Sequence, residues 1–358
     1  MSSPEVGIPS LSSDLHDAAL GRRRFSLGRF LFQIVGFLVG LGLLGWCLHL
    51  ALSSEETRAG LARLFQEAGI RSLGVLILLS SLSLTINGLA FWITLSPIRR
   101  LRMLDVIAVN ALATIAANLP FKLSALLRIL IHNRHDGLAF KTIIAWFAAM
   151  AALTIGVLGP LGLAAVWRRE VDWTWWTTFI GGAAAFATCA VIGGRIARNS
   201  PRLDKLTLGA GHMLGHAPAV FGHVCLRLID ICLQMMRFMV AASILGYTLS
   251  PTAALFFAAT YFITGVVSPA GSLGMREGAV VAAGMLPMGY GPGVEAMAAI
   301  ALIVTAGELL TQFALSIPAL LLIRPDRLIR PRSLVSEPPL SDPPEAGSTN
   351  GTSASEAR

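Results

Sequence analysis

Charged side chains are scarce in this sequence: they make up 13% of its 358 residues, whereas hydrophobic residues make up 54%. The mean hydropathy is correspondingly high, at +0.69. A soluble domain carries a far larger polar share, so this composition argues against a soluble fold and indicates a polytopic membrane protein. Because backbone groups in lipid must be bonded within the segment, the apolar stretches are expected to be helices, which makes the fold class all-α.

Cysteine is also rare. The chain has four: Cys47, Cys189, Cys225 and Cys232. They stand in apolar surroundings without a CxxC pair, so neither a disulfide framework nor a zinc site is indicated. His212 and His216 have the spacing of a metal pair on a helix, but no nearby carboxylate or cysteine completes a coordination shell. We therefore expect no metal and no cofactor.

Acidic residues are fewer than basic ones, which gives a formal net charge of +8. The basic residues gather in short clusters beside apolar segments, including 22–24, 99–102 and 324–332. This pattern is typical of membrane orientation by the positive-inside rule, so nucleic-acid binding is not needed to explain it. The rule places both termini on the cytoplasmic side of the membrane, which we expect to be a bacterial-type inner (cell) membrane.

The longest apolar stretches predict about six full transmembrane helices, each able to cross a hydrocarbon core of roughly 30 Å. They are Phe30 to Leu52, Leu73 to Leu95, Thr142 to Val166, Phe179 to Gly194, Ala219 to Tyr247 and Val294 to Ile323. The transmembrane domain is thus expected at 30–323. Residues 1–29 and 324–358 are too polar to build a core, and we interpret both as largely disordered cytoplasmic extensions.

A later apolar region is interrupted by Val267 to Gly278, VSPAGSLGMREG. Unwound backbone at Pro269, Gly271 and Gly274 cannot face lipid, so we expect a protein-lined pocket there. Arg276 and Glu277 would lie in this pocket, since charges at membrane depth usually meet a partner, an ion or a substrate. The alternative is an extramembrane turn with a solvated ion pair.

An earlier apolar segment, Leu104 to Ile131, is interrupted by polar residues and a proline: Asn110, Asn118, Pro120, Lys122 and Arg128. We predict two half-helices joined near Asn118 that dip in and return to the cytoplasmic side. The alternative is an interfacial amphipathic helix whose cations reach the headgroups. With a second hairpin at 252–288 entered from outside, two re-entrant hairpins would form an inverted arrangement, which points to a transporter binding site near the midplane.

The segment from Ala219 to Tyr247 carries polar residues spaced four, three, four and three apart: His223, Arg227, Asp230, Gln234 and Arg237. On a helix they form one face, where Arg227 and Asp230 can pair. We expect this face to line a hydrated cavity, although a structural ion pair is the alternative. Glu308 and Gln312, one turn apart on the last span, are expected to line the same cavity.

Two groups of these residues resemble paired motifs of a known family. NLPFKLSALLR with HNRHDGLAFKTIIAW, and later SPAGSLGMREG, resemble the lysylphosphatidylglycerol synthase transmembrane, or flippase-like, family over roughly 30–323. The matching positions are Asn118, Pro120, Lys122 and Arg128 in the first motif, and Pro269, Gly271, Gly274, Arg276, Glu277 and Gly278 in the second. The chain departs from the pattern at Ser124 and Ala125, where the family usually has Gly-Glu.

The resemblance implies movement of lipid or polyprenyl-linked headgroups between leaflets. We expect a non-enzymatic translocator for an anionic, polyprenyl, hopanoid or glycolipid-type lipid, without the soluble aminoacyltransferase domain that some members carry. The candidate substrate-binding residues are Asn118, Lys122, Arg128, Arg227, Asp230, Arg237, Arg276, Glu277 and Glu308. The expected partners are the bilayer and its lipid substrate, with a lipid synthase or a second copy as further candidates.

Two alternatives belong to other functional classes. The chain could be an intramembrane enzyme acting on a lipid headgroup, with Glu277 or Glu308 as general base and His223 assisting. It could also be an accessory subunit of a lipid synthase, in which case the polar face would be a helix interface.

Overall fold

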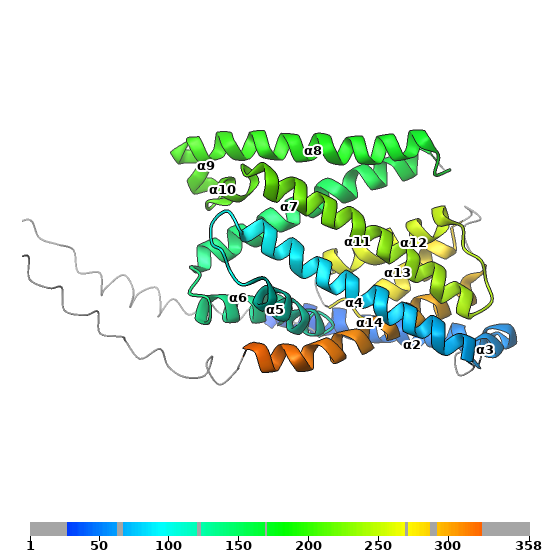
Figure 1. Ribbon diagram of the computed structural model, residues 1–358. Coiled ribbons are helices and arrows are strands. Elements are labelled where there is room, and N and C mark those ends of the chain that lie inside the picture. The colour runs from blue at the N-terminus through cyan, green and yellow to red at the C-terminus, as the bar shows by residue number, and fades with distance from the viewer. Residues whose placement is uncertain are drawn as a thin grey trace, which may run out of the picture.

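The computed structural model describes residues 27–62, 67–119, 123–168, 170–268, 271–286 and 292–323. Within these residues every regular element is a helix, as the composition predicts (Figure 1). Several predictions fall outside the described residues: those for 1–26, for the tail at 324–358, and for Pro120, Lys122 and Pro269.

Five helices each contain a segment of at least 23 residues that is long and apolar enough to cross a membrane. They are α2 (Leu27–Ser53), α4 (Glu67–Leu95), α7 (Phe140–Trp167), α8 (Trp173–Asn199) and α14 (Val294–Ile323). A further helix, α11 (Ala217–Ile244), has 28 residues and is about 42 Å long, although it carries the polar face. The predicted all-helical, polytopic membrane fold is confirmed.

Large apolar side chains cover the outside of the bundle. Phe32, Leu163, Ile317 and Leu321 are 63 to 76% exposed. In water such a surface would favour aggregation, whereas in a bilayer it meets lipid tails of similar polarity. The polar side chains described below are buried instead, among clusters of buried apolar residues.

The first interrupted segment forms two short helices, α5 (Met103–Ala116) and α6 (Leu123–Arg134). At about 21 and 18 Å, neither can cross a core of roughly 30 Å. The two helices pack against each other, and Arg99 Nη1 donates to the carbonyl oxygen of Gly137 at 3.4 Å. Because this contact joins the start of the pair to its end, both lie at the same end of the bundle (Figure 1).

The second interrupted segment forms α12 (Pro251–Val267) and α13 (Met275–Gly284), which also pack against each other. The break between them approaches α2 very closely. Gly274 has φ +81, and a Cβ there would lie 1.7 Å from the carbonyl oxygen of Gly40. Both the dihedral angle and the contact therefore require glycine at this position.

The two breaks meet inside the bundle. The Ser272 N–H donates to the carbonyl oxygen of Ala117 at 3.2 Å. A Cβ on Gly271 would lie 3.4 Å from the carbonyl oxygen of Leu119, so the two chain segments are in van der Waals contact. Two short hairpins, 155 residues apart in sequence at this contact, thus join tip to tip.

Short helices complete the ends of the bundle: α3 (Glu55–Ala62), α9 (Pro201–Leu206) and α10 (Ala210–Leu214). Helices α6, α9 and α10 gather at one end with the last residues of α14, whereas α3 and the connection from α7 to α8 lie at the other (Figure 1). The connection that follows α8 has no apolar period in the sequence, yet α9 and α10 form there.

Candidate functional site

A cavity of about 450 Å³ lies next to both helix breaks and is lined by residues of α4, α5, α6, α7, α11, α12, α13 and α14. Its volume falls in the usual range for small-molecule sites, and it is partly open to the outside. Six charged residues, four basic and two acidic, are among its described lining residues: Arg128, Arg227, Asp230, Arg237, Arg276 and Glu308. The structure therefore brings together most of the residues that the sequence singled out.

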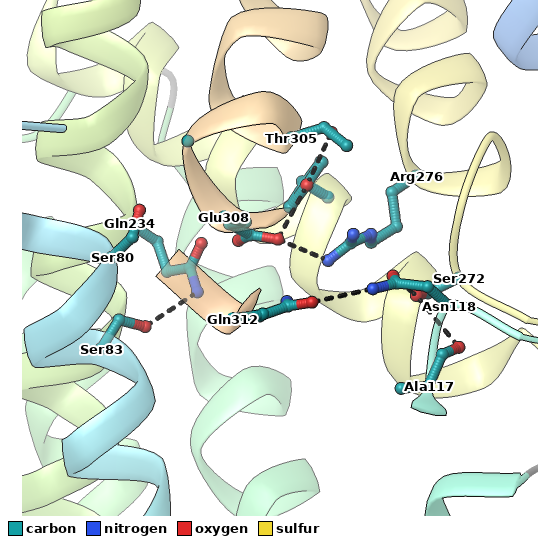
Figure 2. Close-up of polar contacts among 12 residues, drawn as sticks. Ser80, Ser83, Ala117, Asn118, Gln234, Ser272, Arg276, Thr305, Glu308 and Gln312 are labelled. Atoms are coloured by element: carbon teal, nitrogen blue, oxygen red, sulfur yellow. Dashed lines mark hydrogen bonds and ion pairs between the residues drawn. The ribbon is translucent and has the colours of Figure 1, made fainter. Parts of the chain in front are cut away.

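Glu308 is bound by two arginines at the centre of the cavity. Its Oε1 accepts from Arg237 Nη1 at 2.6 Å. Its Oε2 accepts from Arg276 Nη1 at 2.8 Å (Figure 2). The Tyr261 hydroxyl also donates to Oε2, at 3.0 Å. An ion pair between the neighbours Arg276 and Glu277 was only the alternative interpretation of the sequence. Arg276 pairs with Glu308, because consecutive helical residues do not face each other.

Glu277 lies behind the cavity wall rather than on it. Its side chain is 0% exposed and accepts a hydrogen bond from the Thr305 hydroxyl. The Thr305 hydroxyl is in turn 2.9 Å from that of Tyr261, which contacts Glu308. Among the described residues, Thr305 and Tyr261 thus link Glu277 to the cavity.

The polar face of α11 points inward, as its spacing predicts: all five of its residues are buried. Arg227 Nη1 donates to Asp230 Oδ2 at 2.9 Å, which confirms the predicted pair. His223 lies one turn away from Arg227, outside the cavity lining, with its Nδ1 3.0 Å from the Thr94 hydroxyl.

Arg128 enters the cavity from α6. Its Nη2 donates to Asn110 Oδ1 at 2.8 Å, and its guanidinium lies 4.1 Å from the centroid of the Phe91 ring. Among the described residues no carboxylate lies within ion-pair distance of it. Arg128 is therefore the lining arginine whose charge is least compensated by the protein.

Asn118 joins the two helix breaks at one side of the cavity (Figure 2). Its Nδ2 donates to Gln312 Oε1 at 2.8 Å, and its Oδ1 accepts from the Ser272 hydroxyl at 3.1 Å.

On the far side of α13, Gly278 faces Leu43 of α2, where a Cβ would come within 3.2 Å. The described glycines of the second motif therefore serve close packing.

The α6 end beyond Arg128 is held by a cluster of two histidines and an aspartate. Asp136 carboxylate oxygens lie 2.6 Å from His132 Nδ1 and 2.8 Å from His135 Nδ1. Burial alone would raise the pKa of Asp136, but these hydrogen bonds and the histidine charges lower it below its ordinary value. The contribution of the ionised Asp136 to the stability of the fold is therefore present at neutral pH, and it is lost as the pH falls through the lowered pKa.

The His212 and His216 pair does not form a metal site with its neighbours. The His216 ring instead accepts from the Ala219 N–H at 3.3 Å and caps α11. Throughout the described segments, no group of three His, Cys, Asp or Glu side chains is placed to hold a metal ion.

Sequence reasoning missed a second layer of polar residues, on α4 and α12. Asn87 Oδ1 accepts from Arg227 Nη2 at 3.2 Å, and the Ser83 hydroxyl donates to Asp230 Oδ1. Ser80, Ser83 and Asn87 are spaced three and four residues apart, so they share one face of an otherwise apolar helix. That spacing in the sequence could have indicated a polar face on α4, whereas no pattern in the sequence indicated a role for Tyr261.

Residues 33–316 match the family model described as the lysylphosphatidylglycerol synthase TM region. The chain belongs to this family. No curated protein and no solved structure matches it. In this member of the lysylphosphatidylglycerol synthase TM family, all described lining residues of the cavity fall within the matched region. Ser124 and Ala125, where the first motif departs from the usual pattern, lie on the cavity wall beside Arg128.

Proposed function

We propose that this chain moves a lipid with an anionic headgroup between the leaflets of a bacterial-type inner membrane, without changing it chemically. The observation that carries the proposal is the place of the arginine-lined cavity, where the tips of two short helical hairpins meet. Broken helices at membrane depth are tolerated where they line a cavity, and paired breaks are characteristic of transporter binding sites. Membership of a lipid-related membrane family supports the same conclusion.

In this proposal the headgroup enters the cavity while its hydrocarbon chains stay in the bilayer, since the cavity is partly open. Arg128 and Arg276 offer planar forks that suit the oxygens of a phosphate. Glu308 orients Arg237 and Arg276, and Asp230 orients Arg227.

Movement of the hairpins would open the cavity to each leaflet in turn. Among the described residues, the tips are joined by hydrogen bonds from the Ser272 N–H to the Ala117 carbonyl oxygen and from the Ser272 hydroxyl to Asn118 Oδ1. Each is worth about 0.5 to 1.5 kcal/mol, so the contact can break and re-form at moderate cost. We place α5 and α6 as a re-entrant pair from the cytoplasm, and α12 and α13 as one from outside.

The test is lipid transfer in liposomes that contain only this protein and a fluorescent phosphatidylglycerol analogue. We expect transfer by the wild type, near-complete loss in Arg276→Ala, and partial activity in Arg276→Lys, which keeps the charge without the fork. Arg198→Gln is the matched control, because it removes an exposed charge on α8. Wild-type transfer by a folded Arg276→Ala protein would refute the role of Arg276.

The same liposomes separate the rival functions. Lipid extracts analysed by mass spectrometry should contain the unchanged analogue. A modified headgroup would favour the intramembrane enzyme, and neither transfer nor modification would favour the accessory subunit.

A further inference from the structure

We infer that the cavity selects headgroups whose charge is exclusively negative, and rejects headgroups that carry an ammonium group, such as aminoacylated or choline lipids. This inference rests on the proposed function and names the substrate class of the same site. Three independent features of the described lining residues carry it: their net charge, the occupation of their carboxylates and rings, and the kind of polar atom that they leave without a partner.

The charge of the lining is positive. Four arginines face two carboxylates, Asp230 and Glu308, and no other charged residue is among the described lining residues. Arginine stays protonated in proteins, so this excess does not vanish with pH. Even with Glu277 behind the wall included, one positive charge is left over. A site of this kind attracts an anion and opposes the entry of a second cation.

The groups that recognise ammonium elsewhere are already occupied here. Both oxygens of Glu308 accept from arginines, and both oxygens of Asp230 accept from Arg227 and Ser83. A cation entering the cavity would have to displace a guanidinium from its partner. Breaking a buried pair in this way leaves a stranded charge, which is strongly unfavourable.

Three of the four aromatic rings among the described lining residues are occupied in the same way, and Phe147 is the fourth. Each of three rings has a guanidinium over its face: Arg128 over Phe91, Arg227 over Phe262 and Arg276 over Tyr261, at 4.1, 5.2 and 4.4 Å from the ring centroids. Quaternary ammonium and lysyl groups are recognised by such faces when the faces are free. The protein's own arginines therefore occupy three of the four rings that could otherwise bind an ammonium group.

The unpartnered buried atoms of the lining are all donors. They are the Nε atoms of Arg227, Arg237 and Arg276, and the Nη2 of Arg276, none of which has a hydrogen-bond partner among the described residues. Two unpartnered acceptor atoms belong to residues close in sequence to these arginines, His223 Nε2 and Glu277 Oε2, but both residues lie outside the lining. Buried donors without partners need acceptor oxygens, which a phosphate supplies and an ammonium cannot.

The inference is tested with three lipids of identical fluorescent acyl chains in proteoliposomes: phosphatidylglycerol, lysylphosphatidylglycerol and phosphatidylcholine. We expect phosphatidylglycerol to cross faster than the other two by roughly ten-fold, the factor that corresponds to about 1.4 kcal/mol. Equal or faster transfer of either ammonium lipid would overturn the inference and leave the proposed function standing.

If none of the three lipids crosses faster than in protein-free vesicles, the proposed function fails, and binding decides the inference. Thermal unfolding of the full chain in uncharged detergent should shift upward with phosphatidylglycerol and not with lysylphosphatidylglycerol. Equal shifts would overturn it. Soluble glycerol phosphate tests whether the phosphate ester is recognised without its lipid chains. An upward shift of the unfolding temperature with glycerol phosphate supports recognition of the phosphate ester alone. A shift with phosphatidylglycerol but not with glycerol phosphate supports recognition of the whole lipid.

A gain of acidity provides the sharpest variant. Ala125 lines the cavity three residues before Arg128 on α6, so a glutamate there can pair with Arg128. Ala125→Glu should therefore reduce the preference for phosphatidylglycerol several-fold. Ala125→Gln has the same size without the charge and should keep the wild-type preference, whatever rate it retains. An unchanged preference in a folded Ala125→Glu protein would overturn the charge argument.

Discussion

Glu308 contacts arginines from two different helices, Arg237 of α11 and Arg276 of α13. All three side chains are largely buried, so the carboxylate compensates two guanidiniums at once. The reverse does not hold: without Arg276, Glu308 keeps Arg237 and Tyr261 as donors. The partners of this cluster are thus unequal in what their loss leaves behind.

We therefore expect Glu308→Gln to cost far more stability than Arg276→Ala. Removing the carboxylate leaves two buried cations uncompensated, a change worth about 3 to 5 kcal/mol. Removing Arg276 forfeits one charged hydrogen bond, about 1.5 to 3 kcal/mol. The measurement is purified yield and thermal unfolding of each variant in detergent. Equal losses would show that Glu308 is not shared between the two arginines.

At the scale of elements, α2 and the break before α13 touch through their backbones. A Cβ on Gly40 would lie 2.7 Å from the carbonyl oxygen of Leu273, and one on Gly274 would lie closer still to Gly40. A Cβ on Gly42, two residues further along α2, would meet no atom of a neighbouring segment within 4 Å. The same helix therefore offers a glycine that is needed for packing and one that is not.

We expect Gly40→Ala to lower the unfolding temperature and to reduce lipid transfer, because α2 must move away from the break that shapes the cavity. Overpacking of this kind costs about 1 to 3 kcal/mol. Gly42→Ala should be neutral or stabilising by up to about 1 kcal/mol, since alanine favours helix. Equal behaviour of the two variants in a thermal unfolding assay would contradict the close contact.

Helices and breaks could be predicted from the sequence, because apolar length and Pro/Gly interruptions are local signals. The apolar run at 294–323 coincides with α14. At α8 the prediction began too late: the helix begins at Trp173, where Asp172 accepts from the Trp175 N–H at 2.8 Å. Trp173, Trp175 and Trp176, which precede the predicted start at Phe179, therefore belong to its first turn.

The partners of the polar residues could not be predicted in the same way. Periodicity shows which face of a helix is polar, and it placed the α11 residues correctly. It does not show which helix that face meets. Arg276 and Glu308 are 32 residues apart, and Asn87 and Arg227 are 140 apart. Such pairings depend on tertiary packing, which one sequence does not display.

At the scale of the whole molecule, the helices beside the predicted cytoplasmic clusters gather at one end (Figure 1). Arg99, Arg195 and Lys205 belong to connections or helix ends on that side. The acidic and mixed segment with α3 lies at the opposite end. This distribution motivates an orientation with both termini in the cytoplasm.

The orientation is tested by labelling single cysteines in a chain whose four native cysteines are replaced by alanine. We expect Lys141→Cys to be labelled from the cytoplasm, and Glu170→Cys and Pro292→Cys from outside. Each residue lies at a loop or helix end of the described chain. Labelling of the last two from opposite sides would refute the inverted hairpins, because one extra crossing reverses everything downstream.

The contact between Ser272 and Ala117 can form only late in the synthesis of the chain. Its two residues are 155 positions apart, which at roughly 5 to 20 residues per second means about 8 to 30 s of synthesis. During that interval the tip of the first hairpin lacks the segment that bonds its carbonyl group. An unpaired peptide group is costly in lipid, so the first hairpin must stay hydrated, or sheltered by the insertion machinery, until the second hairpin arrives.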